Sequence, residues 1–251
     1  MSRRLVALVA PVVLIALLSA AGCATDGGVN RQDAAAANAN VGADYLHKGQ
    51  NDRARQAFQK ALHYDSDNFT ANWGMAVVSE RLDEPAQAKR YFKKTLSIRP
   101  AAEVYNSYAA FLCEQGKTDQ GLANFKRALK AGNSGDRADS LANAGLCLYR
   151  AKRTKQAAQY FRRALKADPK QAKALTHLAS IEYHAQNYLS ARAFIERADA
   201  ATKLDAAQLL LAARIELALH DRSAAAAYLK RHNAKKPTAS RSLSQLESSR
   251  Q

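Results

Sequence analysis

The sequence has few of the residues that interrupt helices or favour sheets. Its 251 residues include 11 glycines, 5 prolines and one tryptophan, and aromatic residues make up 7% of the chain. β-Branched residues are sparse as well, whereas alanine, the strongest helix former, is abundant. This composition disfavours a sheet and predicts an all-α protein.

Sequence motifs that would indicate an enzyme are missing. The chain contains no glycine-rich phosphate loop, no Gly-x-Ser-x-Gly and no His-Glu-x-x-His sequence. Of its six histidines, only His177 and His184 could share a helix face, and no third ligand stands at metal-binding spacing. Residues 65–68 begin like a calcium loop but lack its glycine and closing glutamate, so we interpret them as a turn. We predict no enzymatic activity, no cofactor and no metal site.

Acidic residues are also scarce relative to basic ones. There are 38 Lys and Arg against 22 Asp and Glu, which gives a formal net charge of +16. A surplus of this size makes nucleic acid, anionic lipid and acidic proteins candidate partners. Because the basic residues are spread along the whole chain, we interpret them mainly as solvated helix faces and expect no nucleic-acid partner.

The N-terminus has the pattern of a secretory signal. Arg3 and Arg4 form a positive segment, and an apolar run follows from Leu5 to Leu18. As a helix this run would reach about 21 Å, which is short for a hydrocarbon core about 30 Å thick. We therefore predict that residues 1–22 are a cleaved signal peptide.

The residues Ala20-Ala21-Gly22-Cys23 resemble a bacterial lipobox, although Ala20 stands where leucine is usual. The resemblance implies that Cys23 is lipidated and becomes the first mature residue, with a flexible linker over residues 23–34. Several acyl chains at about 0.8 kcal/mol per buried CH₂ would make attachment effectively permanent. By the same resemblance, Ala24 implies the periplasmic face of the outer membrane. The alternative is an ordinary cleaved signal with a cysteine nearby.

Past the linker, one pattern recurs six times at gaps of 34, 33, 36, 34 and 34 residues. Its marker is a small residue followed four positions later by a large apolar one: Ala54 and Phe58, Ala88 and Phe92, Gly121 and Phe125, Ala157 and Phe161, Ala191 and Ile195, Ala225 and Leu229. The pattern predicts six helix-turn-helix units of the tetratricopeptide type over residues 35–237, stacked into a superhelical solenoid. Unit six is the least regular and is expected to cap the stack, and residues 238–251 are expected to be disordered.

The inner surface of such a solenoid should be lined by positions two, five, nine and twelve of the first helix in each unit. These candidate groove residues are Leu46, Trp73, Val77, Glu80, Asn106, Ala110, Leu146, Tyr149, Ser180 and Tyr183. An aromatic groove with scattered polar groups suits a helix or an extended peptide of a partner protein. Tryptophan is a favoured anchor in interfaces, but Trp73 could instead be partly buried between helices.

Cys113 and Cys147 fall in the first helices of units three and four, which should be neighbours. Paired thiols in the periplasm tend to oxidise, so we predict a possible disulfide. The two positions are out of equivalence by two residues, and the alternative is a pair of buried free cysteines.

The order of features over residues 38–245 resembles one family, the type IV pilus biogenesis and stability lipoproteins of the PilF/PilW pilotin type. Similar stretches include residues 106–116, residues 141–147 and residues 221–229. The resemblance implies an outer-membrane protein that binds the pilus secretin and assists its localisation and multimerisation. The alternative function is an outer-membrane scaffold for peptidoglycan-remodelling enzymes or for assembly of the envelope, which would make another envelope protein the partner.

Overall fold

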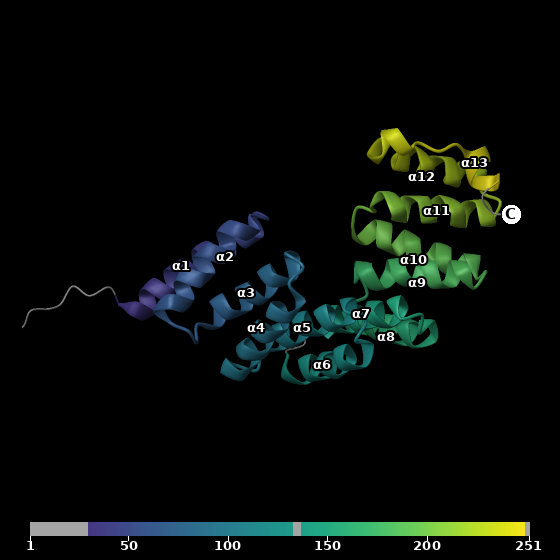
Figure 1. Ribbon diagram of the computed structural model, residues 1–251. Coiled ribbons are helices and arrows are strands. Elements are labelled where there is room, and N and C mark those ends of the chain that lie inside the picture. Colours follow the sequence, from purple (N-terminus) through teal and green to yellow (C-terminus); the bar gives the residue numbers. More distant parts are fainter. Residues whose placement is uncertain (1–29, 133–136, 249–251) are drawn as a thin grey trace, which may run out of the picture.

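The computed structural model describes residues 30–132 and 137–248, and within them every long element is an α-helix (Figure 1). The twelve long helices are α1 (Arg31–His47), α2 (Asn51–Tyr64), α3 (Phe69–Arg81), α4 (Pro85–Ile98), α5 (Ala102–Glu114), α6 (Thr118–Ala131), α7 (Arg137–Arg150), α8 (Thr154–Ala167), α9 (Ala172–His184), α10 (Tyr188–Ala201), α11 (Ala206–Ala218) and α12 (Arg222–Lys235). They form six antiparallel pairs, one for each predicted unit. The all-α solenoid of six helix-turn-helix units is confirmed.

The repeated small and large residues hold each pair together. In α2, Ala54, Phe58 and Ala61 lie on one face and are almost completely buried. The small side chains let the partner helix approach, and burial of the ring contributes roughly 1.5–3 kcal/mol. Phe161 occupies the same place in α8 and is also fully buried.

The turn inside each pair has one residue with a left-handed backbone. These residues are Gly49, Asp83, Gly116, Lys152, Gln186 and His220, with φ between 56° and 72°. Their spacing equals that of the small residues in the second helices, so the turn belongs to the repeat. Only two of the six are glycine, the residue that adopts this conformation without strain.

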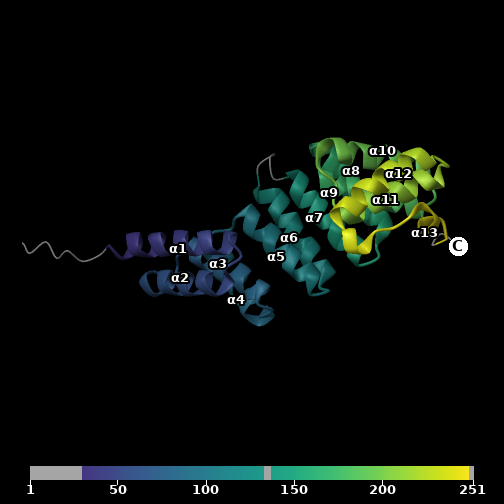
Figure 2. The ribbon, with the colours of Figure 1, turned by 90° about the horizontal axis from the view of Figure 1, so that it is seen from above.

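The six units follow a curved path (Figure 1), and the same molecule seen from above is an elongated row (Figure 2). Along the stack, first helices contact one another: α1 with α3, α5 with α7, α7 with α9, and α9 with α11. Helices on the inside of a curve lie closer together than those on the outside. The first helices therefore line the inner side of the solenoid, and the second helices face outward.

The boundary predicted for the linker, residue 34, is too late by a few residues. Helix α1 begins at Arg31, because the side chain of Asn30 accepts a hydrogen bond from the backbone of Gln32 at 3.1 Å and caps the helix. Ala35 and Ala39 are then buried against the rest of the first unit. The alanine-rich stretch has a high helix propensity and finds a surface to pack on.

The prediction of a disordered tail was wrong for most of its residues. A 3₁₀ turn, η2 (Pro237–Ala239), and a short helix, α13 (Leu243–Ser248), follow α12. Leu246 is fully buried against Leu217 and Leu229. The apolar face of unit six is covered by α13. The cap of the stack is therefore α13 packed on unit six.

Candidate partner-binding surface

The ten candidate groove residues lie where the repeat pattern places them. They come from the first helices α1, α3, α5, α7 and α9, and each of them is partly exposed. Their contacts connect neighbouring units: Asn143 donates a hydrogen bond to Asn106 at 3.3 Å, and the hydroxyls of Tyr149 and Ser180 lie 3.3 Å apart. The residues form one continuous inner surface, and their role in binding stays a prediction.

At the N-terminal end this surface contains a cavity of about 500 Å³ between α1 and α3. Three of the predicted residues, Leu46, Trp73 and Val77, line it. The other lining residues are Ala43, His47, Phe58, Thr70, Gly74 and Arg81. Its size is within the range of ligand-binding pockets, and most of its lining is apolar, as such pockets require.

Two glycines make room for the ring of Phe58, which lines this cavity. A Cβ atom on Gly42 would lie 2.6 Å from the ring of Phe58, and one on Gly74 would lie 2.2 Å from the same ring. The ring is therefore held between α1 and α3 at a distance that only glycine allows. A glycine inside a helical pattern is a signal of close approach, and Gly74 could have been singled out on that ground.

Trp73 is partly buried between helices, and its role as an interface anchor stays a prediction. Its ring is partly buried and packs edge-on against Phe69, with the ring centroids 6.1 Å apart. Its indole N–H is buried and has no hydrogen-bond acceptor among the described residues. Trp73 is thus part of the helix packing and part of the cavity wall.

In the middle of the inner surface, two carboxylates lie close together. Burial, together with the charge and hydrogen bonding of Glu114, raises the pKa of Glu80 to about 7. Glu114 in turn forms an ion pair with Arg150, whose guanidinium donates a hydrogen bond to its carboxylate at 3.1 Å. Glu80, on α3, is therefore the member of this group that holds a proton near neutral pH.

Between units four and five, aromatic side chains pack on one another at the inner surface. The ring of His177 stacks on Phe161 with centroids 5.2 Å apart, and Tyr149 lies 5.3 Å from the same histidine. Burial lowers the pKa of His177, which keeps the imidazole neutral. His177 is a packing residue in this structure, and no cluster of potential metal ligands occurs in the part of the chain that the structure describes.

Sequence profiles of the tetratricopeptide repeat match residues 100–170 and residues 45–111 and 148–215. The second profile accounts for more than half of the chain. This chain belongs to the tetratricopeptide-repeat family. The matches begin and end inside units, yet together they cover most of the six helix pairs that form the solenoid.

Within this family, the repeat protein is similar to the type IV pilus assembly protein PilF of Pseudomonas aeruginosa. The two are 28% identical over 227 residues, which is 87% of this chain and 90% of the relative. A solved structure of Pseudomonas aeruginosa PilF covers 88% of this chain and 99% of its own, with a TM-score of 0.75 and 27% identity. PilW, described as a widely conserved type IV pilus biogenesis factor, has a TM-score of 0.72 at 24% identity over 86% of this chain and 98% of its own, and so shows the fold.

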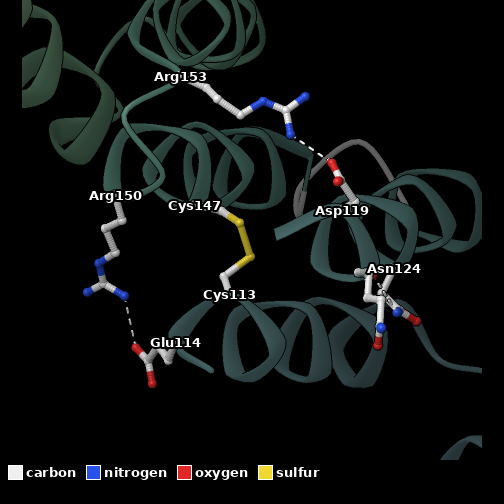
Figure 3. The surroundings of a disulfide bond; sticks show 8 residues. Cys113, Glu114, Asp119, Asn124, Cys147, Arg150 and Arg153 are labelled. Carbon is white, nitrogen blue, oxygen red and sulfur yellow. Dashed lines mark hydrogen bonds and ion pairs between the residues drawn. A yellow bond between two sulfur atoms is a disulfide. The ribbon is translucent and has the colours of Figure 1, made fainter. Parts of the chain in front are cut away.

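A disulfide joins the repeat protein's third and fourth units. Cys113 on α5 and Cys147 on α7 have their Cα atoms 5.5 Å apart, despite their different positions within the two units (Figure 3). Gly121 on α6 gives the bond room, because a Cβ there would lie 2.3 Å from the sulfur of Cys113. Arg153 and Asp119 also form an ion pair, at 2.7 Å, between the same two units.

Two acidic residues stand where apolar ones are expected in the last units, and each has an arginine partner. Glu182 accepts from Arg162 at 2.8 Å, and the buried Glu216 forms an ion pair with Arg192. A buried carboxylate without a partner would be costly. The arginines come from neighbouring second helices, so these pairs join helices across the C-terminal half.

The N-terminal prediction concerns residues outside those that the structure describes, and Cys23 is one of them. Among residues 30–132 and 137–248, none of the helices has the length and apolar character needed to cross a membrane. The signal peptide, the lipid anchor and the outer-membrane location therefore stay predictions.

Proposed function

We propose that this repeat protein is a lipid-anchored scaffold for biogenesis of the type IV pilus, and that it binds the pilus secretin through its inner surface. Binding assists the localisation of the secretin in the outer membrane and its multimerisation. The observation that carries the proposal is the open apolar cavity of the first unit, in a chain similar to PilF over most of its length. The protein itself has no catalytic role in this proposal.

The cavity suits an apolar segment of the partner. Leu46, Trp73 and Val77 offer apolar surface, and Arg81 at the rim is held by a hydrogen bond from its guanidinium to the carbonyl of Leu46 at 2.7 Å. A helix or an extended strand that inserts one or two large side chains would exclude water from this surface. The buried, unpaired N–H of Trp73 lies beside the same cavity.

The predicted anchor at Cys23 strengthens binding in this scheme. A scaffold and a secretin subunit that share one membrane surface meet at a high effective concentration, so a modest affinity for each subunit is sufficient. The segment from Cys23 to the start of α1 at Arg31 is short. It would hold the first unit, and with it the cavity, near the membrane.

The test begins with deletion of the gene in the source bacterium, followed by measurement of heat-resistant secretin multimers in membrane extracts and of surface pili. Loss of both supports the proposal. If multimers persist while pili are lost, the protein acts in pilus stability. If both persist, the assignment to pilus biogenesis fails and the scaffold for peptidoglycan-remodelling enzymes becomes the better hypothesis.

Complementation with point variants then locates the activity. Val77→Glu introduces a charge into the cavity and should fail to restore multimers. Val41→Glu is the matched control, because Val41 lies on α1 of the same unit, is 48% exposed and does not line the cavity. Cys23→Ala should leave the fold intact but mislocalise the protein and the secretin together. Equal activity of both valine variants would argue against the cavity as the binding site.

A further inference from the structure

The net positive charge is divided unequally between the two sides of the solenoid. The six second helices together carry twenty Lys and Arg against four Asp and Glu. The six first helices together carry six Lys and Arg against eight Asp and Glu. The outer side is therefore strongly basic and the inner side close to neutral. A negatively charged partner would therefore be attracted to the second helices.

On this outer side a groove of about 460 Å³ opens between α4 and α6, with α5 as its floor. Its floor and lower walls are apolar or aromatic and include Leu96, Tyr108 and Leu112. Lys93 on α4 and Arg127 on α6 stand on its two walls. None of the described residues that line it is acidic.

No carboxylate among the described residues compensates either cation, as is also true of many other basic residues of the second helices. Within the described ranges, Lys93 has no ion-pair or hydrogen-bond partner, and Arg127 reaches only the side-chain oxygen of Asn124, at 3.5 Å. By contrast, Arg231, at the position equivalent to Arg127, binds Asp199 at 2.6 Å. Charge is thus left available at this groove and not at the equivalent place in the last unit.

From this geometry we infer a second binding site, which takes an acidic peptide segment of a protein partner. Its carboxylates pair with Lys93 and Arg127, and an apolar side chain between them covers Leu96 and Leu112. A flat layer of lipid headgroups fits less well, because it would use the protruding lysines of α6, Lys126 and Lys130, and would leave the apolar floor uncovered. This site lies on the side opposite the first-unit cavity, so both can be occupied at once.

The test uses the full-length protein in a non-ionic detergent and a short fluorescent peptide of glutamate with interspersed leucine. Binding is followed by anisotropy at low and at moderate salt. Charge reversal at the groove, Lys93→Glu with Arg127→Glu, should weaken binding by about ten-fold or more. The matched control, Lys126→Glu with Lys130→Glu on α6, changes the net charge equally outside the groove and should weaken binding by no more than about three-fold.

Three results would overturn the inference. Equal weakening by both double variants would mean attraction by net charge alone. Equal binding of a peptide with lysine in place of glutamate would mean apolar adsorption. Displacement of the peptide from wild type and control alike by mixed micelles of phosphatidylglycerol, but not phosphatidylcholine, would mean a lipid-binding surface.

Two further measurements separate this site from folding and from the proposed function. Circular dichroism and thermal unfolding of the groove variant should match those of the control, since both exchange exposed side chains. Val77→Glu should bind the acidic peptide as tightly as wild type. Val77→Glu could fail to restore secretin multimers in the cell and still bind this peptide normally. That result would support the groove between α4 and α6 as a site independent of the first-unit cavity.

Discussion

The inner surface of the first two units and that of units four and five are built from the same repeat and yet differ in what they leave open. Phe58 in the first unit and Phe161 in the fourth hold the same position. Beside Phe58 the following unit places Gly74, and a cavity remains. Beside Phe161 the equivalent residue is His177, whose ring stacks on it. At this position the first cavity thus has a glycine, whereas the ring of Phe161 is covered by an aromatic side chain.

The charged residues follow the same division. In the N-terminal half, Glu80 lies near another carboxylate, Glu114, and its pKa rises. In the C-terminal half, Glu182 and Glu216 each have an arginine partner. The two buried carboxylates of the C-terminal half are therefore compensated by arginines, whereas Glu80 in the N-terminal half lies beside a second carboxylate.

The largest expected effect comes from removing the disulfide between the third and fourth units. Cys113→Ser with Cys147→Ser should lower the free energy of unfolding by about 3–4 kcal/mol, because the disulfide restricts a loop of 34 residues in the unfolded chain. Urea denaturation with and without reductant measures this, and reductant should not affect the double variant. In protein with Cys23→Ala, two reactive thiols after denaturation without reductant would contradict the bond itself.

Exchanging the deciding residues tests the comparison directly. Gly74→His should lower the free energy of unfolding by about 1–3 kcal/mol, since any side chain there overlaps Phe58. It should also abolish binding at the first-unit cavity. The reverse change, His177→Gly, should cost roughly 0.3–0.5 kcal/mol in helix propensity alone and open space beside Phe161.

Fluorescence of a hydrophobic dye measures both outcomes of this exchange. Dye binding should fall in Gly74→His and rise in His177→Gly, at concentrations where both proteins are folded. Unchanged dye binding in the two variants would show that this position does not control the opening.

Glu80 should make stability depend on pH in one direction. Its folded pKa of about 7 exceeds its usual value near 4.5, so between these values the folded state holds more protons than the unfolded state. Stability therefore falls as pH rises from 4.5 to 7 and stays reduced above it. Glu80→Gln should flatten this fall and raise the unfolding temperature at pH 8. Glu182→Gln, which removes an arginine-paired carboxylate, is the contrasting variant and should not raise it.

The smallest effect concerns the left-handed turns, which use glycine in units one and three but Lys152, Gln186 and His220 in units four to six. Replacing one of these three by glycine should add roughly 0.5–1 kcal/mol, as relief of strain outweighs the entropy of the unfolded chain. Gly116→Ala should lower stability by a similar amount. Thermal unfolding of single variants measures both, and equal melting temperatures would show that these turns are not strained.

The repeat period alone was enough to predict six helix pairs and their inner faces, because every unit repeats the same small and large positions. It was not enough to predict α13, since covering Leu217 and Leu229 is a requirement of the last unit and not of the period. The start of α1 depended on a single cap, Asn30, within an alanine-rich stretch.

The candidate site was predictable as a surface but not as a pocket. The positions of Leu46, Trp73 and Val77 follow from helix geometry. Beside them the ring of Phe58 meets Gly42 and Gly74 from two different helices, which is a contact in space that spacing along the chain does not encode. The groove between α4 and α6 was missed because the basic residues were considered along the chain, not by which side of the solenoid they occupy.

The covering of the last unit by α13 gives the solenoid a fixed end, whereas the first unit ends with Val41 exposed. A further module can then be added anywhere ahead of unit six, but not beyond it without displacing α13. A copy of one unit inserted between α10 and α11 would meet the same surfaces that its neighbours already present to each other. The length of the solenoid can thus change in steps of one module without redesign of the end that α13 covers.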